Sequence, residues 1–429
     1  MLNNISNKKI LCNFNDFSNK GFINFLNKIS KRNKITVITS NLNAKKFFKN
    51  TNISFKYLKN ENNNTFRFIN FFSKINKSNI EKFYHIENLL FNYSILRKPF
   101  YFIKLFFFYT NIGIKKNSLR KFFLNKEKIS LNYDLLLVDF RFNEIYTNHN
   151  ILYAAIKAKI RIYSIVFSWD NIFSADVNLI SNKYYVPSNF LKKEISSRHK
   201  IEMNKIDILK PFQFNYIGQN SKFKLNKLNK FNKKKYILFV CCTEDNSRAS
   251  IEEFNIINHI GEYLIKNNSN IIIKVRPYPY LSKKSNLKKR IKFKNIFIEN
   301  YGSLRIRRVF NNKIEYMRYE INDDYKYELI KNSIAVINFY STMGIESVLI
   351  KKFTLFLNIK FDNLNFFQYL KSHSFKVKFL DHYKYLESRK TYLKTLDKLN
   401  KNLDFIIKKN KNIKYNISDY VYFKKIFYN

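Results

Sequence analysis

The segment NFYSTMGIESVLIKKFTLFLNI, residues 338–359, joins two apolar runs through a short helical pattern that opens with hydroxyl residues. Ser341 and Thr342 stand where the first run ends, and Glu346 follows about one helical turn later. A strand, a helix and a second strand in this order are typical of a parallel sheet covered by helices. The segment therefore predicts an α/β fold in which hydroxyls lie at a helix N-terminus.

The same alternation continues back to residue 236. Strands are expected at 236–242, 270–276, 333–339 and 353–359, and helices at 251–266, 325–332 and 341–350. This block is predicted to be a C-terminal Rossmann-like domain, residues 236–385. A helical tail, residues 386–429, follows it and is expected to pack back on the N-terminal domain.

The N-terminal part repeats the pattern less cleanly. Apolar strands are expected at 8–14, 35–40, 133–140 and 161–167, with helical spacing at 22–29 and 151–160. Residues 1–212 are thus predicted to form a second Rossmann-like domain, and the lysine-rich stretch 213–235 a linker. Two such domains predict a cleft between them, facing the carboxyl ends of both sheets.

The net charge of +48 has two explanations. The 79 Lys and Arg residues are spread along the whole chain of 429 residues, and Lys, Asn, Ile, Phe and Tyr all have AT-rich codons. Mutational bias on solvated surfaces therefore explains the charge, although the field favours phosphate ligands. The positive charge could also indicate a nucleic-acid-binding protein, which is the alternative hypothesis from a different functional class. No RNP, KH, zinc-finger or helix-turn-helix signature supports it.

Targeting and redox signals are weak. Three cysteines, Cys12, Cys241 and Cys242, build no disulfide framework, and the N-terminus lacks the apolar core of a signal peptide. The sequence therefore predicts a cytoplasmic protein. An aromatic block with flanking cations, residues 97–116, predicts either a core helix or contact with the anionic inner face of the plasma membrane.

Four groups of polar residues follow apolar strands, where ligands of open parallel sheets bind. Ser341 and Thr342 at a helix N-terminus suit a phosphate, Arg276 at a strand end suits a second phosphate contact, and Glu346 suits a ribose. The plainer alternatives are a helix cap, an arginine paired with a structural carboxylate, and a solvated glutamate.

The remaining groups lie in loops. Asp170 is the candidate general base, and the residues expected to contact acceptor or donor are Trp169, Asn171, Asp139, Thr243, Glu244 and Asn246. Many such loops only connect elements. No Asp-x-Asp pair stands at a strand end, since Asp323 and Asp324 are expected in a polar loop, so no metal is predicted.

Together, SWDN (168–171), YYVPSNFLKKEI (184–195), Arg276-Pro277 and NFYSTMGIES (338–347) resemble bacterial GT-B glycosyltransferases of surface-carbohydrate (capsule or O-antigen) biosynthesis. CDP-glycerol glycerophosphotransferases are more distantly similar. The resemblance covers roughly residues 133–359. It implies a GT-B-like fold, with Ser341 and Thr342 on the diphosphate of a nucleotide-sugar donor, Glu346 on its ribose and Arg276 on a phosphate.

The resemblance also implies a saccharide or lipid-linked acceptor and no cofactor beyond the nucleotide sugar. One position departs from the family, because Tyr278 stands where a histidine often follows the Arg-Pro pair. This departure counts against the glycerophosphotransferase reading. It leaves open a catalytically silent homologue, and a nucleotide-sugar epimerase on the same fold is a further alternative.

Overall fold

The computed structural model describes a little over half of the chain. The described residues are 5–14, 17, 20–42, 44–48, 52–58, 131–141, 149–167, 180–214, 217, 234–242, 248–278, 280–282, 287–299, 306–311, 314–319, 323–339, 341–359, 389–409 and 413–428. They divide into two compact units, Met1–Phe214 with Ile426–Tyr428, and Asn215–Lys425 with Asn429.

The first unit is built on a seven-stranded parallel sheet in the order β3-β2-β1-β4-β5-β6-β7. Its strands are β1 (Lys9–Asn13), β2 (Lys34–Thr39), β3 (Ser54–Tyr57), β4 (Leu135–Asp139), β5 (Arg161–Ile165), β6 (Lys183–Val186) and β7 (Ile206–Ile208). Its helices are α1 (Lys20–Ser30), α2 (Ala44–Phe47), α7 (His149–Lys157) and α8 (Asn189–His199), with 3-10 turns η5 (Met203–Lys205) and η6 (Phe212–Phe214).

Both faces of this sheet are covered, because neighbouring residues of a strand point to opposite faces. On one face Ile10 and Cys12 of β1 pack with Phe22 and Leu26 of α1. On the other face Leu11 packs with residues of α7. The apolar runs are near-continuous for this reason, as expected of strands buried on both sides.

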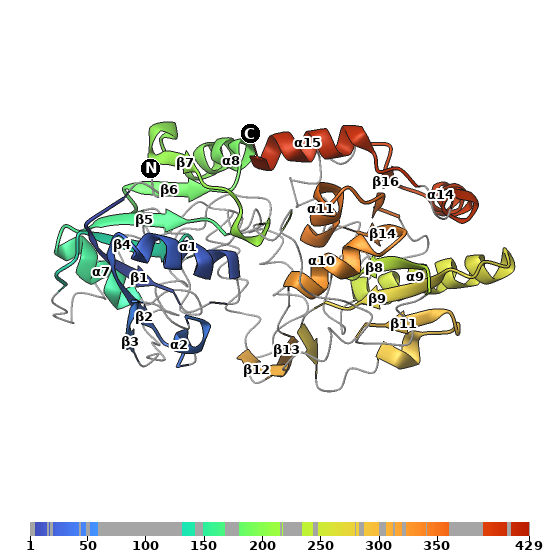
Figure 1. The fold of residues 1–429 in the computed structure, drawn as a ribbon, viewed down its shortest axis with the longest axis horizontal. Helices are drawn as coiled ribbons and strands as arrows, with labels where there is room; N and C mark the ends of the chain where they lie inside the picture. The colour runs from blue at the N-terminus through green and yellow to red at the C-terminus, as the bar shows by residue number, and fades with distance from the viewer. Residues whose placement is uncertain are drawn as a thin grey trace, which may run out of the picture. The chain divides into compact units, whose positions relative to one another are not determined.

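The second unit has a six-stranded parallel sheet in the order β11-β9-β8-β14-β15-β16 (Figure 1). Its strands are β8 (Tyr236–Val240), β9 (Ile272–Arg276), β11 (Ile296–Ile298), β14 (Ala335–Asn338), β15 (Thr354–Leu357) and β16 (Tyr392–Leu393). Its helices are α9 (Arg248–Lys266), α10 (Asp323–Lys331), α11 (Thr342–Leu349), α14 (Leu396–Lys409) and α15 (Ile417–Tyr428), with the 3-10 turn η9 (Leu287–Arg290); the last three residues of α15 are grouped with the first unit.

The two faces of the second sheet carry different helices. Ile237 and Phe239 of β8 belong to the core that includes residues of α9 and α14. Tyr236, Leu238 and Val240 belong to the opposite core, with Tyr325 of α10 and Met343 of α11. The strand order, written from the first strand of the unit, is 3-2-1-4-5-6, which is the doubly wound order of Rossmann folds.

The structure confirms every strand and helix expected in residues 236–359, and it differs from the sequence prediction in three places. A separate antiparallel sheet, of β10 (Tyr280–Ser282), β13 (Ile314–Tyr319) and β12 (Ile306–Asn311), was not foreseen. Asp323 and Asp324, expected in a loop, form the first turn of α10. The segment after residue 385 is not wholly helical, because β16 pairs with β15 and extends the sheet.

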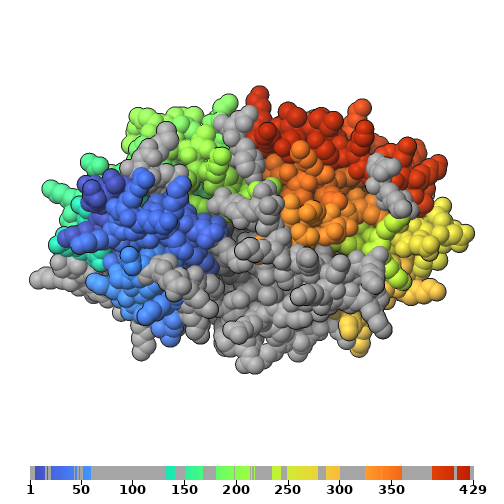
Figure 2. All heavy atoms as spheres, in the orientation of Figure 1, coloured from blue at the N-terminus to red at the C-terminus, as the bar shows by residue number. Residues whose placement is uncertain are grey.

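The C-terminal helices pack on the second unit. In the core shared with α9, Leu399, Leu403 and Ile406 of α14 are completely buried. Figure 2 shows the C-terminal segment, in red, at the surface beside the orange residues of the same unit. Asp419 of α15 accepts a hydrogen bond from Thr391 at 2.6 Å, which ties α15 to the start of β16.

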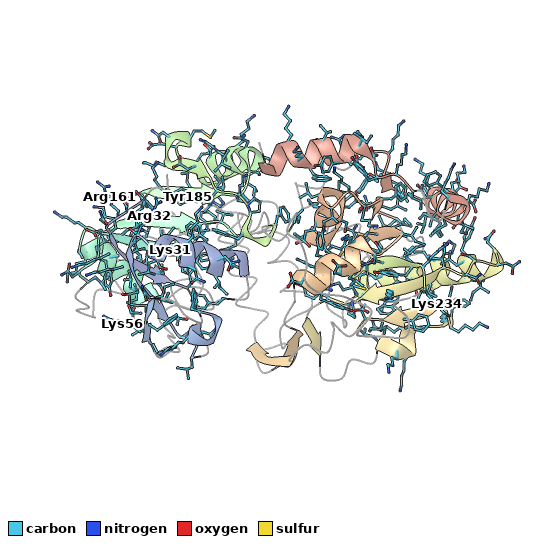
Figure 3. All side chains as sticks on the ribbon, in the orientation of Figure 1. Lys31, Arg32, Lys56, Arg161, Tyr185 and Lys234 are labelled. Atoms are coloured by element: carbon cyan, nitrogen blue, oxygen red, sulfur yellow. The ribbon has the colours of Figure 1, made fainter. Side chains whose placement is uncertain are left out.

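Basic side chains are spread over the described surface. Lys31, Arg32, Lys56 and Arg161 of the first unit are exposed, as is Lys234 at the start of the second (Figure 3). None of the described helices is both long enough and apolar enough to cross a membrane. The aromatic block of residues 97–116 lies outside the described residues, as does most of the expected linker, 213–235.

Candidate functional site

The carboxyl edge of the second sheet brings together residues that are far apart in sequence. The parallel register aligns Arg276 of β9 with Val240 of β8, Val240 with Asn338 of β14, and Asn338 with Phe356 of β15. Neighbouring strands lie about 4.8 Å apart, so Arg276 and Asn338 are separated by roughly 10 Å. The strand order reverses between β8 and β14, and such switch points are where open α/β sheets bind ligands.

The N-terminus of α11 lies directly after this row. Ser341 is its N-cap, and its hydroxyl accepts a hydrogen bond from the Met343 amide at 3.1 Å. Thr342 is the first helical residue and is half-buried; its amide and hydroxyl make no hydrogen bond within the described part of the chain. The N-terminus of α11 thus presents hydrogen-bond donors and a partial positive charge, which together favour the binding of an anion.

Asn338 shapes the turn into α11. Its Oδ1 accepts a hydrogen bond from the Ser341 amide at 3.0 Å, and its Nδ2 donates to the Leu355 carbonyl at 3.3 Å. Gly344 packs so closely against this amide that a Cβ there would lie 2.5 Å from Nδ2. A Cβ at residue 344 would therefore force the Asn338 side chain to shift.

Glu346 lies one turn into α11 and is buried, with 3% of its surface exposed. Its Oε1 accepts a hydrogen bond from the Lys326 ammonium of α10 at 2.9 Å, and this forms a buried ion pair. The alternative of a solvated surface glutamate is therefore wrong. The expected contact of Glu346 with a ribose stays a prediction.

Arg276 is buried at the end of β9 and lies close to the carboxylate of Glu299, which follows β11. Burial raises the pKa of Glu299, and the nearby cations of Lys274 and Arg276 partly oppose that rise. The Tyr325 hydroxyl of α10 donates a hydrogen bond to Glu299. Lys274 lies over the ring of Tyr236, 4.1 Å from its centroid, and burial lowers the pKa of this lysine.

Asp139, in the first unit, forms an ion pair with Arg141. Arg141 donates to Asp139 through Nε at 3.0 Å and Nη2 at 2.6 Å, and the Arg141 amide adds a third bond at 2.8 Å. The carboxylate of Asp139 is buried and bidentately bound at the end of β4. This pair therefore has a structural role at the end of β4, and the expected contact of Asp139 with a substrate stays a prediction.

The structure brings Arg276, Ser341, Thr342 and Glu346 to one end of the second unit. The other expected site residues, Trp169, Asp170, Asn171, Thr243, Glu244 and Asn246, lie outside the described residues. Sequence reasoning missed Asn338, Lys326, Glu299 and Tyr325. Only Asn338 gave a signal, as a polar residue closing an apolar strand; the others lie within or after elements that carry no motif.

Comparison with known proteins supports the fold. The sequence matches no protein-family model, and no curated protein matches it. Among solved structures, that of S. aureus MnaA with UDP matches with a TM-score of 0.50 at 11% identity, covering 98% of this chain and 91% of that chain.

Two further structures are similar. A protein from Listeria monocytogenes assigned as UDP-N-acetylglucosamine 2-epimerase matches with a TM-score of 0.52 at 10% identity, over 98% of this chain and 92% of that chain. A glycosyltransferase from Rickettsia africae matches with a TM-score of 0.42 at 12% identity, over 99% of this chain and 100% of that chain. The chain thus has the α/β, GT-B-like fold of two Rossmann-like domains.

Proposed function

We propose that this chain is a nucleotide-sugar enzyme whose second unit binds the nucleoside diphosphate. The observation that carries the proposal is the row of strand ends that aligns Arg276 with Asn338, three residues before Ser341, the N-cap of α11. Backbone donors and a guanidinium converging on one edge are what a diphosphate requires. In this proposal Ser341, Thr342 and Arg276 bind the diphosphate, and Glu346 accepts hydrogen bonds from the ribose.

The reaction proposed first is transfer of the sugar to an acceptor hydroxyl of a surface polysaccharide or lipid-linked saccharide. When the bond to the sugar breaks, negative charge develops on the leaving diphosphate. The helix N-terminus and Arg276 stabilise that charge without reorganisation, because both are already fixed by the fold. Asp170 is the base proposed from the sequence to take the proton of the acceptor.

Epimerisation of a nucleotide sugar is the second candidate. The observation that favours it is the pair of solved structures with TM-scores of 0.50 and 0.52, one bound to UDP and the other assigned as a UDP-N-acetylglucosamine 2-epimerase. Both candidates place a nucleoside diphosphate in the same site. They differ in whether turnover requires an acceptor.

Thermal unfolding with UDP, GDP, CDP and CMP, and with their sugar conjugates, tests the shared binding site. A ligand at about 100 times its Kd adds about 2.7 kcal/mol, which raises the Tm of a unit of this size by roughly 5–10 °C. Ser341→Ala should remove most of this shift. Ser188→Ala is the matched control, because Ser188 caps α8 of the first unit in the same way, accepting from the Leu191 amide at 3.2 Å.

Both serine variants should lose about 1 kcal/mol of stability without ligand, since each loses one cap. A ligand shift that is unchanged in Ser341→Ala would contradict the proposed site. Proton NMR of UDP-N-acetylglucosamine incubated with enzyme alone then separates the two reactions. A new sugar resonance without acceptor favours the epimerase, and turnover only after an acceptor is added favours the transferase.

A further inference from the structure

Lys326 and Glu346 form a buried ion pair between two helices that approach the same edge of the sheet. Lys326 lies in the first turns of α10 and Glu346 in the first turns of α11, and their Nζ and Oε1 atoms are 2.9 Å apart. The side chains are only 10% and 4% exposed. Glu346 is therefore a buried, paired carboxylate that lies about one helical turn after the α11 N-terminus, where the diphosphate is proposed to bind.

Stability alone is a weak reason for this arrangement. Taking two charges out of water is costly, and apolar residues of similar volume often serve a protein core equally well. The exposed pair Lys266–Glu262, at 2.7 Å on α9, avoids that desolvation. A short contact between two buried charged groups does, however, restrict both side chains to one geometry, and in some proteins buried polar groups are retained for such specificity.

The residue before Lys326 on α10 also binds a carboxylate. Tyr325 donates a hydrogen bond to Glu299, the carboxylate that lies near Arg276. Two consecutive residues of α10 thus bind two carboxylates, Glu299 after β11 and Glu346 in α11.

We propose that Lys326 is a positioning residue that fixes the Glu346 carboxylate to accept hydrogen bonds from ribose hydroxyls, and that it thereby sets the preference for ribonucleotides over 2′-deoxyribonucleotides. Binding Oε1 to Lys326 fixes the plane of the carboxylate, and hence the direction of the lone pairs on Oε2. This inference rests on the proposed function, because it needs a nucleotide in the site. It adds a residue that no motif of the sequence marks.

The test is calorimetric titration of the full chain with UDP and 2′-deoxy-UDP, and with the corresponding GDP and CDP pairs. A hydrogen bond to a charged acceptor predicts that the wild type binds the ribonucleotide roughly ten- to hundred-fold more tightly. In Lys326→Met the ratio should fall to within about three-fold, while the affinity for 2′-deoxy-UDP stays near the wild-type value. Lys326→Arg should restore part of the ratio.

Lys326→Met leaves a buried carboxylate without its cation, so the variant is at risk of misfolding. The double variant Lys326→Met with Glu346→Gln removes both charges, and is expected to fold and to bind both nucleotides equally. Lys266→Met is the control, since it breaks an exposed ion pair in the same unit and should leave the ratio unchanged.

Three results would overturn the inference. In the first, the wild type binds UDP and 2′-deoxy-UDP equally, which leaves the proposed diphosphate site intact. In the second, Lys326→Met and the double variant weaken both nucleotides by the same factor, as a purely structural role predicts. In the third, no nucleotide binds the wild type, and the proposed function fails together with the inference.

Discussion

The side chain of Asn338 lies against the backbone of Gly344, across the turn that starts α11. A Cβ on Gly344 would come within 2.5 Å of Asn338 Nδ2 and 2.6 Å of Oδ1. Asn338 can move aside only by losing the hydrogen bond that it accepts from the Ser341 amide and the one that it donates to the Leu355 carbonyl. The geometry of the α11 N-terminus therefore depends on the contact between Asn338 and Gly344.

Gly344→Ala should destabilise the second unit and weaken nucleotide binding. Overpacking costs about 1–3 kcal/mol, and the better helix propensity of alanine offsets about 1 kcal/mol of this. The displaced Asn338 would release the Ser341 amide, so UDP binding should weaken at least about ten-fold, more than the stability change alone explains. Urea unfolding and calorimetric titration measure the two effects.

Gly261→Ala is the control for that experiment. A Cβ on Gly261 would lie 2.7 Å from Cδ1 of Ile296, the far end of a flexible side chain. Cγ1 of the buried Ile296 would also lie only 3.0 Å away, so this variant should lose stability too. Its nucleotide affinity should stay normal, because Gly261 belongs to α9 and not to the turn that starts α11. Equal losses of affinity in both variants would contradict a special role for the Asn338–Gly344 contact.

Arg276→Lys should selectively weaken the binding of diphosphates. Lysine keeps the charge but loses the planar, bidentate fork of the guanidinium. We expect the ratio of UDP affinity to UMP affinity to fall roughly ten-fold, which calorimetry measures directly. If Arg276 serves only to balance the negative charge of Glu299, the Tm of Arg276→Lys will fall while the ratio of UDP affinity to UMP affinity stays constant.

Arg290→Lys is the matched substitution for Arg276→Lys. Arg290 also belongs to the second unit, donates to the Ser250 hydroxyl at 2.8 Å, and lies over the ring of Phe254. It follows no strand of the parallel sheet, so its replacement should change stability without changing the ratio of the two nucleotide affinities.

Glu299→Gln should change the pH dependence of stability. Burial raises the pKa of Glu299, so between its ordinary value and the raised one the native state binds more protons than the unfolded state. The free energy of unfolding contributed by this group therefore falls as pH rises through that window. Relative to Glu299→Gln, the wild type should gain stability as pH is lowered from about 7 to about 4.5. Urea unfolding across this range checks the sign.

Glu262→Gln should show the opposite pH dependence of stability. A hydrogen bond and the charge of Lys266 lower the pKa of Glu262, so its contribution is present above the ordinary pKa and lost as pH falls through the folded value. The wild type should therefore lose stability relative to Glu262→Gln on acidification. The difference in unfolding free energy between wild type and variant is thus expected to change with pH in opposite directions for Glu299→Gln and Glu262→Gln. A change in the same direction for both would show that burial of Glu299 has no measurable effect.

Leu403→Ala tests whether α14 belongs to the core of the second unit. Leu403 is completely buried in the cluster that also includes residues of α9, so its truncation should cost about 2–5 kcal/mol. Leu396→Ala, on the same helix but 38% exposed, should cost less than about 1 kcal/mol. Similar small effects for both variants would mean that α14 is a loosely attached tail.

The sequence predicted the parallel sheet of the second unit well, because strands buried on both faces read as continuous apolar runs. It also located Ser341 and Thr342 at the start of a helix, because the hydroxyls stand between an apolar strand and a helical pattern, and the structure confirms this position with Ser341 as the N-cap. β16 escaped notice because two residues carry no periodicity. The β12–β13 hairpin was missed because Arg and Glu interrupt its apolar alternation.

The partners of the site residues are harder to predict than the residues themselves. Lys326 is one of many lysines, and only the packing of α10 against α11 identifies it as the partner of Glu346. The same holds for Glu299, which lies near Arg276 because β11 pairs with β9. Such pairs depend on tertiary packing between distant segments, which local patterns do not encode.

The pairing of β16 with β15 has a consequence for synthesis on the ribosome. The second sheet starts at Tyr236 but gains its last strand only at Tyr392, and α14 covers one face later still. At 5–20 residues per second, the stretch from the end of β15 at Leu357 to Tyr392 of β16 takes roughly 2–7 s to synthesise. During that time β15 is an unpaired, apolar edge on a nascent chain, the kind of surface that chaperones protect from aggregation.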